Sequence, residues 1–215
     1  TRVNVGKSLA VLRIMLNYAI AQELIASNPA NIVRVKIAER DRPLMVIPGR
    51  DNVRAILQEF NRRIRETQSD FHYRAWIRAN AFVTLLAATG MRVSECRGLP
   101  LGAYDHERGE ITVKQRADES GEIGPPKTRS GHRTLLLSKE CCAVVDRHLV
   151  VNEPTEFVFE TTSHRPIYGQ NIYARFWKPA LRSLDLGDTA LSNRNGKQIV
   201  DFRCRFDLKS LRHFR

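Results

Sequence analysis

The chain has 215 residues, of which 42% are hydrophobic, so it can bury a core and is not a disordered protein. Lysine and arginine number 35 against 23 acidic residues, and the net charge of +12 favours a polyanionic partner such as DNA or RNA. No apolar run approaches the roughly 18 residues of a membrane-spanning helix, and no signal-peptide pattern opens the sequence. We therefore expect a cytoplasmic protein without a membrane partner.

The first segment predicts one long amphipathic helix. Apolar residues recur at helical spacing over residues 5–24, and the turn-forming residues that follow at 27–29, Ser-Asn-Pro, end the pattern. Residues 31–50 then carry mixed charges, two prolines and a glycine without sustained periodicity, which is typical of a linker. We expect a domain boundary near residues 40–48 and divide the chain into domains at 1–40 and 41–215.

The second domain is predicted to be α+β and mainly α-helical. Apolar spacing indicates helices that begin near residue 53 and cover residues 73–89, 138–151 and 169–185. Alternating β-forming residues at 110–115 and branched or apolar residues at 132–137, around a Gly- and Pro-rich middle, predict a small antiparallel sheet. Residues 187–200 show neither the apolar spacing of a helix nor the alternation of a strand, and we expect a loop there.

The most specific stretch is TGMRVSE at residues 89–95, followed by CRGL. Attack on a phosphodiester passes through a doubly charged, five-coordinate phosphorus, and the planar guanidinium of Arg92 can bind two of its oxygens. Gly90 permits a sharp turn, so that Arg92 begins the next helix, where free N–H groups also favour an anion. Glu95 lies on the same side of that helix and can orient the guanidinium. The competing interpretation is an ordinary surface pair of Arg92 and Glu95.

Two further basic boxes follow. PPKTRSGHRTLLL at residues 125–137 lies between the two expected strands, and KSLRHF occupies residues 209–214. A lysine such as Lys127 carries a proton that it can donate to a reacting group. Alone, the second box would indicate a solvated basic turn. The order and spacing of the three boxes carry more weight than any one of them.

Together the boxes resemble those of the tyrosine recombinases, the phage integrase family. In that family two arginines bind the scissile phosphate, and a lysine on a β-hairpin acts on the leaving oxygen. The resemblance therefore implies catalytic roles for Arg92, Lys127 and Arg212, with support from Glu95. Lys209 stands where most members carry histidine, a variation known within the family, and it still offers a proton and a positive charge.

The resemblance also implies a fold, a reaction and partners. It implies an integrase-type catalytic domain, preceded by the last helix of a core-binding domain, which the first helix and its SNPA ending resemble. The reaction is site-specific recombination, as in integration or excision by a phage or mobile element, through a 3′-phosphotyrosyl intermediate. The partners are double-stranded DNA and further protomers of a tetramer, with no metal and no cofactor. We expect contacts with the DNA backbone from Arg129, Arg133, Lys7 and Arg13.

The nucleophile of the family is not found in the expected place. A tyrosine follows the second arginine by some tens of residues in the family, whereas this sequence ends three residues after Arg212. None of the five tyrosines stands in that position: Tyr18, Tyr73, Tyr104, Tyr168 and Tyr173. We therefore expect a fragment that binds DNA and assembles much of the phosphate pocket but cannot cleave.

Three alternatives remain open. A type IB topoisomerase uses a similar pocket, and a non-catalytic regulator or accessory factor would bind DNA without cleaving it. RNA binding is the third and weaker alternative, since no aromatic RNA-recognition motif is present. Scattered histidines, unpaired cysteine spacing and the lack of an acidic triad count against a metal-dependent nuclease or integrase.

Overall fold

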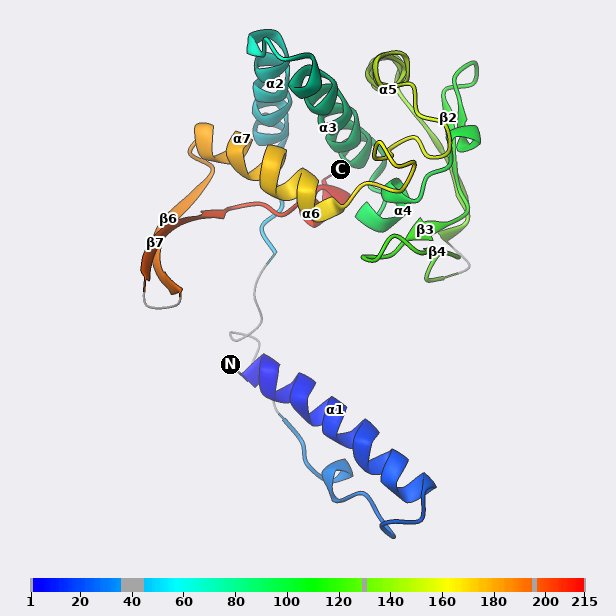
Figure 1. Cartoon of the computed structure of the whole chain (residues 1–215), viewed down its shortest axis with the longest axis vertical. Helices are drawn as coiled ribbons and strands as arrows, with labels where there is room; N and C mark the ends of the chain where they lie inside the picture. The colour runs from blue at the N-terminus through cyan, green and yellow to red at the C-terminus, as the bar shows by residue number, and fades with distance from the viewer. Residues whose placement is uncertain (1, 36–44, 129–130, 195–196, 215) are drawn as a thin grey trace. The chain divides into compact units, whose positions relative to one another are not determined.

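The structure, a computed structural model, describes residues 2–35, 45–128, 131–194 and 197–214. Its internal contacts divide the chain into two compact units, Thr1–Met45 and Val46–Arg215 (Figure 1). Among the described helices, none combines the length and the apolar character that crossing a lipid bilayer would require.

The first unit is one helix with a segment folded back on it. Helix α1 covers Arg2–Ala21, and the short 3-10 helix η1 covers Pro29–Asn31. The buried Asn28 side chain accepts a hydrogen bond from the N–H of Ala30 (2.9 Å) and donates to the carbonyl oxygen of Arg13 (3.1 Å). The SNPA run predicted as a helix stop therefore also attaches the returning segment to α1.

The second unit is built around helix α3, Asp70–Thr89, which packs against both α2, Arg50–Glu66, and α5, Lys139–Asn152 (Figure 1). Half of the residues of α3 are buried, which explains the nearly continuous apolar character of its sequence. Its core contacts include edge-to-face packing of Phe82 on Phe159, with ring centroids 5.1 Å apart. The helices expected over 73–89 and 138–151 are confirmed.

Small antiparallel sheets lie between α4, Val93–Arg97, and α5. Strands β1 (Tyr104–Asp105), β2 (Glu110–Val113) and β5 (Arg133–Leu136) form one sheet in that order. Strands β3 (Arg116–Ala117) and β4 (Ile123–Gly124) form a second pair. The expected small antiparallel sheet is confirmed, and its register pairs Val113 with Arg133.

The helix expected over 169–185 is present in three parts. Helix α6 (Gly169–Ile172) continues through a π-helical turn, η5 (Tyr173–Trp177), into α7 (Lys178–Ser183). A π-helical turn inserts an extra residue into a helix and is frequent at functional sites. The 3-10 helix η6, Leu208–His213, contains most of the third basic box and contacts α3.

The expectation of a loop over residues 187–200 is wrong. Strands β6 (Gly187–Arg194) and β7 (Lys197–Cys204) form an antiparallel hairpin that extends away from α7 (Figure 1). Its sequence lacks the usual apolar alternation because much of the hairpin is not packed on the core: the cross-strand pair Leu191 and Val200 is 70% and 55% exposed. Backbone hydrogen bonds between the strands, rather than a buried face, define these residues as β-structure.

Candidate functional site

Arg92 is placed by the way α3 ends. The Thr89 hydroxyl donates to the carbonyl oxygen of Leu85 (2.6 Å) and accepts from the N–H of Met91 (3.3 Å). Gly90 follows with φ +64°, a left-handed conformation that glycine adopts without strain. Arg92 then takes the N-cap position of α4, one residue before the helical turn in which the sequence placed it.

Glu95 holds Arg92 in place. Its Oε1 accepts from the guanidinium Nη1 of Arg92 (2.6 Å), and its Oε2 accepts from the backbone N–H of the same residue (2.9 Å). The Glu95 side chain is 1% exposed, whereas that of Arg92 is 27% exposed. Arg92 therefore keeps a partly open face beside a buried carboxylate. This arrangement differs from the ordinary surface pair that was the competing interpretation.

The same carboxylate binds a second arginine. Arg133, the first residue of β5, donates from Nη2 to Oε2 of Glu95 (2.9 Å). Burial alone would raise the pKa of Glu95, but the hydrogen bonds from Arg133 and Arg92 outweigh it and hold that pKa below its ordinary value. Two guanidinium groups and one carboxylate thus form a cluster with a net positive charge of one.

The third box presents its basic side chains to solvent. In η6, Leu208, Ser210 and Leu211 are buried, while Lys209 and Arg212 are exposed. The carboxylate of Asp207 caps the start of η6, and the indole N–H of Trp177 donates to the carbonyl oxygen of Phe206 (3.0 Å) just before it. The buried face of η6 thus anchors the segment.

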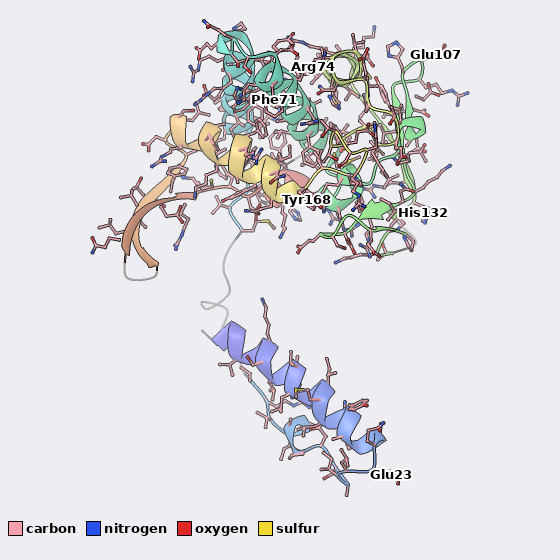
Figure 2. All side chains as sticks on the ribbon, in the orientation of Figure 1. Glu23, Phe71, Arg74, Glu107, His132 and Tyr168 are labelled. Carbon is pink, nitrogen blue, oxygen red and sulfur yellow. The ribbon has the colours of Figure 1, made fainter. Side chains whose placement is uncertain are left out.

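A cavity of about 490 Å³ joins the first and third boxes. Val93, next to Arg92, lines it together with Lys209, more than a hundred residues later in the chain. Tyr168, which Figure 2 labels at the start of α6, lines it as well. The other lining residues include charged side chains and residues of α6 and η5: Arg97, Glu119, Gly169, Gln170, Tyr173, Asp207 and Leu208. The fold therefore brings Lys209 to the same cavity as the beginning of α4.

Arg97 is a residue of this cavity that the sequence did not single out. It is 4% exposed, donates to the carbonyl oxygens of Ile167 (2.5 Å) and Asp118 (2.6 Å), and lies over the ring of Tyr168. Burial lowers its pKa. Its Nη2 atom is buried and has no hydrogen-bond partner. The signal in the sequence was a basic residue one helical turn after Val93, where an apolar residue would ordinarily be buried.

Among the described residues, no three His, Cys, Asp or Glu side chains gather as a metal site would require.

The family model "Phage integrase family" matches residues 49–189, about two thirds of the chain. The chain belongs to the phage integrase family. The matched range of this integrase includes the first two boxes and ends within β6, before η6. A search of curated proteins found no match.

Solved structures of other integrases share this fold. A structure of the Tn1549 transposon integrase in complex with transposon right end DNA is 18% identical, with a TM-score of 0.65 over 98% of this integrase and 64% of that chain. A lambda integrase dimer bound to a COC′ core site is 13% identical, with a TM-score of 0.58 over 99% of this integrase and 52% of that chain. At such identities the likeness shows the fold alone. This integrase spans less than two thirds of either chain's length.

The remaining predicted site residues lie in the basic boxes and on α1. Lys127 lies exposed in the loop between β4 and β5, and its approach to Arg92, like that of Arg212, stays a prediction. Lys7 is exposed on α1, whereas Arg13 donates to the carbonyl oxygens of Ala30 (3.0 Å) and Val33 (2.5 Å). The remaining predicted DNA contact, Arg129, lies outside the described residues.

Proposed function

We propose that this integrase is the catalytic core of a site-specific DNA recombinase. The observation that carries the proposal is the partly open guanidinium of Arg92, held by buried Glu95 at the start of α4, where the next residue, Val93, lines a cavity together with Lys209. Such a preorganised cation is what a phosphorus centre with growing negative charge requires. Fixed donors of this kind cost no reorganisation during the reaction.

In the proposed reaction, a tyrosine hydroxyl gives up its proton to the surrounding water and attacks the scissile phosphorus; a 3′-phosphotyrosyl bond forms as the bond to the 5′-oxygen breaks. The 5′-oxygen leaves with a proton from Lys127, while Arg92 and Arg212 bind the two non-bridging oxygens. Lys209 adds a positive charge and a second possible proton donor. Rejoining is the reverse attack by a 5′-hydroxyl, and no metal or cofactor enters either step.

The proposed substrate is double-stranded DNA of a phage or other mobile element. The charge of +12 supports this proposal, as does the Tn1549 integrase compared above, which is described in complex with transposon right end DNA. We assign residues 1–40 to the last helix of a core-binding domain and residues 41–215 to the catalytic domain. Further protomers would complete a tetramer on two duplexes.

We also propose that none of the five tyrosines of this chain is the nucleophile. The Tyr104 hydroxyl donates to Asp146 (2.7 Å). Burial, and to a lesser extent this hydrogen bond, raises the pKa of Tyr104. The Tyr73 hydroxyl accepts from Arg147 (3.2 Å), and burial together with a hydrogen bond to Cys204 raises the pKa of Tyr173. A phenol with a raised pKa is a poorer nucleophile at neutral pH. This chain by itself should therefore bind DNA without cleaving it.

A nicked suicide substrate carrying the cognate site tests both statements. We expect no covalent protein–DNA adduct from residues 1–215, and an adduct from a full-length protein that carries a tyrosine after Arg212. An adduct from residues 1–215 would refute the statement about the tyrosines. Failure of both proteins, with DNA binding intact, would favour an accessory factor, and relaxation of any supercoiled plasmid without a site would favour a topoisomerase.

A further inference from the structure

The loop that carries Lys127 is closed next to this residue. The N–H of Gly131 donates to the carbonyl oxygen of Thr128 (2.9 Å), and a Cβ added at Gly131 would overlap the Cβ of Pro126. Pro126 and Gly131 are both buried, although Lys127 itself is exposed. Since Pro126 is the neighbour of Lys127 in the chain, the place of Lys127 depends on where Gly131 is held.

Arg133 holds Gly131 and Glu95 with a single side chain. Its Nη1 donates to the carbonyl oxygen of Gly131 (3.1 Å), and its Nη2 donates to Oε2 of Glu95 (2.9 Å). The backbone of Arg133 is paired with Val113 of β2. A guanidinium is planar and rigid, so these two hydrogen bonds set the separation of the loop and the carboxylate.

Glu95 transmits this constraint to Arg92. Its Oε2 accepts from both the Arg133 guanidinium and the backbone N–H of Arg92, and its Oε1 accepts from the Arg92 side chain. The Glu95 side chain is almost completely buried, so little water competes for these hydrogen bonds. A continuous series of contacts thus runs from Arg92 to the loop of Lys127.

From this series of contacts we infer that Arg133 is a positioning residue, which sets the place of Lys127 relative to Arg92. The inference rests on the proposed function, in which these two side chains act on the same phosphodiester. It differs from a direct contact of Arg133 with a DNA phosphate, because two donors of the guanidinium are already used within the protein. A displacement of about 1 Å at a reacting group can cost about 100-fold in rate.

Amide hydrogen exchange on the free protein tests the link without DNA. We expect Arg133→Met to speed amide exchange at Gly131, whose N–H donates to Thr128 within the loop, and at Arg92, whose N–H donates to Glu95. Arg133→Lys, which can replace only one of the two hydrogen bonds, should have a smaller effect. Lys114→Met is the matched control, because it removes one exposed charge immediately after Val113, the last residue of β2. Unchanged exchange of α3 amides would show that each variant is folded. Exchange at Gly131 and Arg92 that Arg133→Met leaves unchanged would overturn the inference.

Single-turnover cleavage by the full-length protein tests the chemical consequence. One substrate carries the natural 5′-oxygen at the leaving position, and the other carries sulfur, which departs without a proton because a thiol has a pKa of about 8.5. We expect Arg133→Met to slow cleavage of the oxygen substrate about 100-fold and to leave most of the rate on the sulfur substrate, with DNA affinity unchanged.

Two outcomes would contradict this expectation in different ways. Equal losses on the oxygen and sulfur substrates, or weaker DNA binding with a salt slope reduced by about one, would make Arg133 a phosphate contact and overturn the inference. Absence of an adduct from the unsubstituted full-length protein would overturn the proposed function alone, because the exchange measurement requires neither DNA nor cleavage.

Discussion

At the scale of single residues, Arg92 is distinguished by its environment rather than by its charge. Its guanidinium is hydrogen-bonded to a carboxylate that water hardly reaches, so the side chain is held in place by the protein alone. Many of the other basic residues of the chain are exposed and can hold the DNA backbone without such a brace. Binding and chemistry should therefore depend on different arginines.

We predict that Arg92→Ala and Arg212→Ala in the full-length protein lower the rate of cleavage by about 100-fold or more, as loss of a transition-state donor does. The dissociation constant for the same duplex should change only a few-fold, because other cations still contact the backbone. Single-turnover cleavage and titration of labelled DNA give the two numbers. Equal losses in both would contradict the assignment.

Glu160 provides a pH-dependent contribution to folding. Burial opposes its ionisation, but the N–H groups of Phe157, Glu156 and Thr155 donate to its carboxylate and lower its pKa to about 2. Because the folded pKa lies below the ordinary value of 4.5, this contribution is complete above that value and is lost as the pH falls toward 2.

We predict that Glu160→Gln lowers the free energy of unfolding at pH 7 by about 1–3 kcal/mol, through loss of charge-assisted hydrogen bonds. The difference from the unsubstituted protein should shrink as the pH falls from 5 to 2 and vanish below pH 2. Thermal unfolding at a series of pH values measures it. Glu156→Gln, at an exposed neighbouring carboxylate, is the control and should show no such trend. A difference that is constant with pH would refute the proposed role of the charge.

At the scale of elements, the sequence predicted those parts of the fold that bury an apolar face. The spacing in α3 and α5 and the β-formers of β2 and β5 indicated structure because these elements pack on the core. The β6–β7 hairpin was missed because it packs little on the core. An available signal was the Asn-Gly pair at residues 195–196, which favours a tight hairpin connection.

The site was predictable only in part, for a similar reason. The pair of Arg92 and Glu95 follows from helical spacing, since the two residues are three apart. The hydrogen bond from Arg133 to Glu95 spans 38 residues and depends on the register of β2 and β5, which no local pattern specifies. The buried position of Arg97 depends likewise on carbonyl groups contributed by distant loops.

The base of the hairpin depends on a glycine. A Cβ at Gly187 would overlap the carbonyl oxygen of Arg203 and lie 2.5 Å from the ring of Phe202. We predict that Gly187→Ala lowers the free energy of unfolding by about 1–3 kcal/mol, as overpacking does. Gly102→Ala is the control, because nothing lies within 4 Å of a Cβ there. Denaturant unfolding compares them, and equal effects would contradict the steric explanation.

At the scale of the whole molecule, the net charge should determine how the proposed DNA partner is held. With a net charge of +12, we predict that the affinity for duplex DNA falls steeply with salt, by about 1,000-fold between 50 and 200 mM if about six phosphates are contacted. Lys7→Met should reduce the slope of log K against log salt by about one if α1 contributes a phosphate contact. Titrations at four salt concentrations measure the slope. Affinity that is insensitive to salt would rule out an interface based on phosphates.

The two ends of the β6–β7 hairpin lie close together. The N–H of Arg205 donates to the carbonyl oxygen of Leu186 (3.0 Å), and Trp177 is joined to Phe206 immediately afterwards. These two hydrogen bonds hold the backbone just before η6, and neither of them involves the outer part of the hairpin. Changing the length of the hairpin at its outer end, or attaching a fluorophore there, should thus leave Lys209 and Arg212 undisturbed. The outer end is therefore a suitable labelling site for following the proposed assembly on DNA.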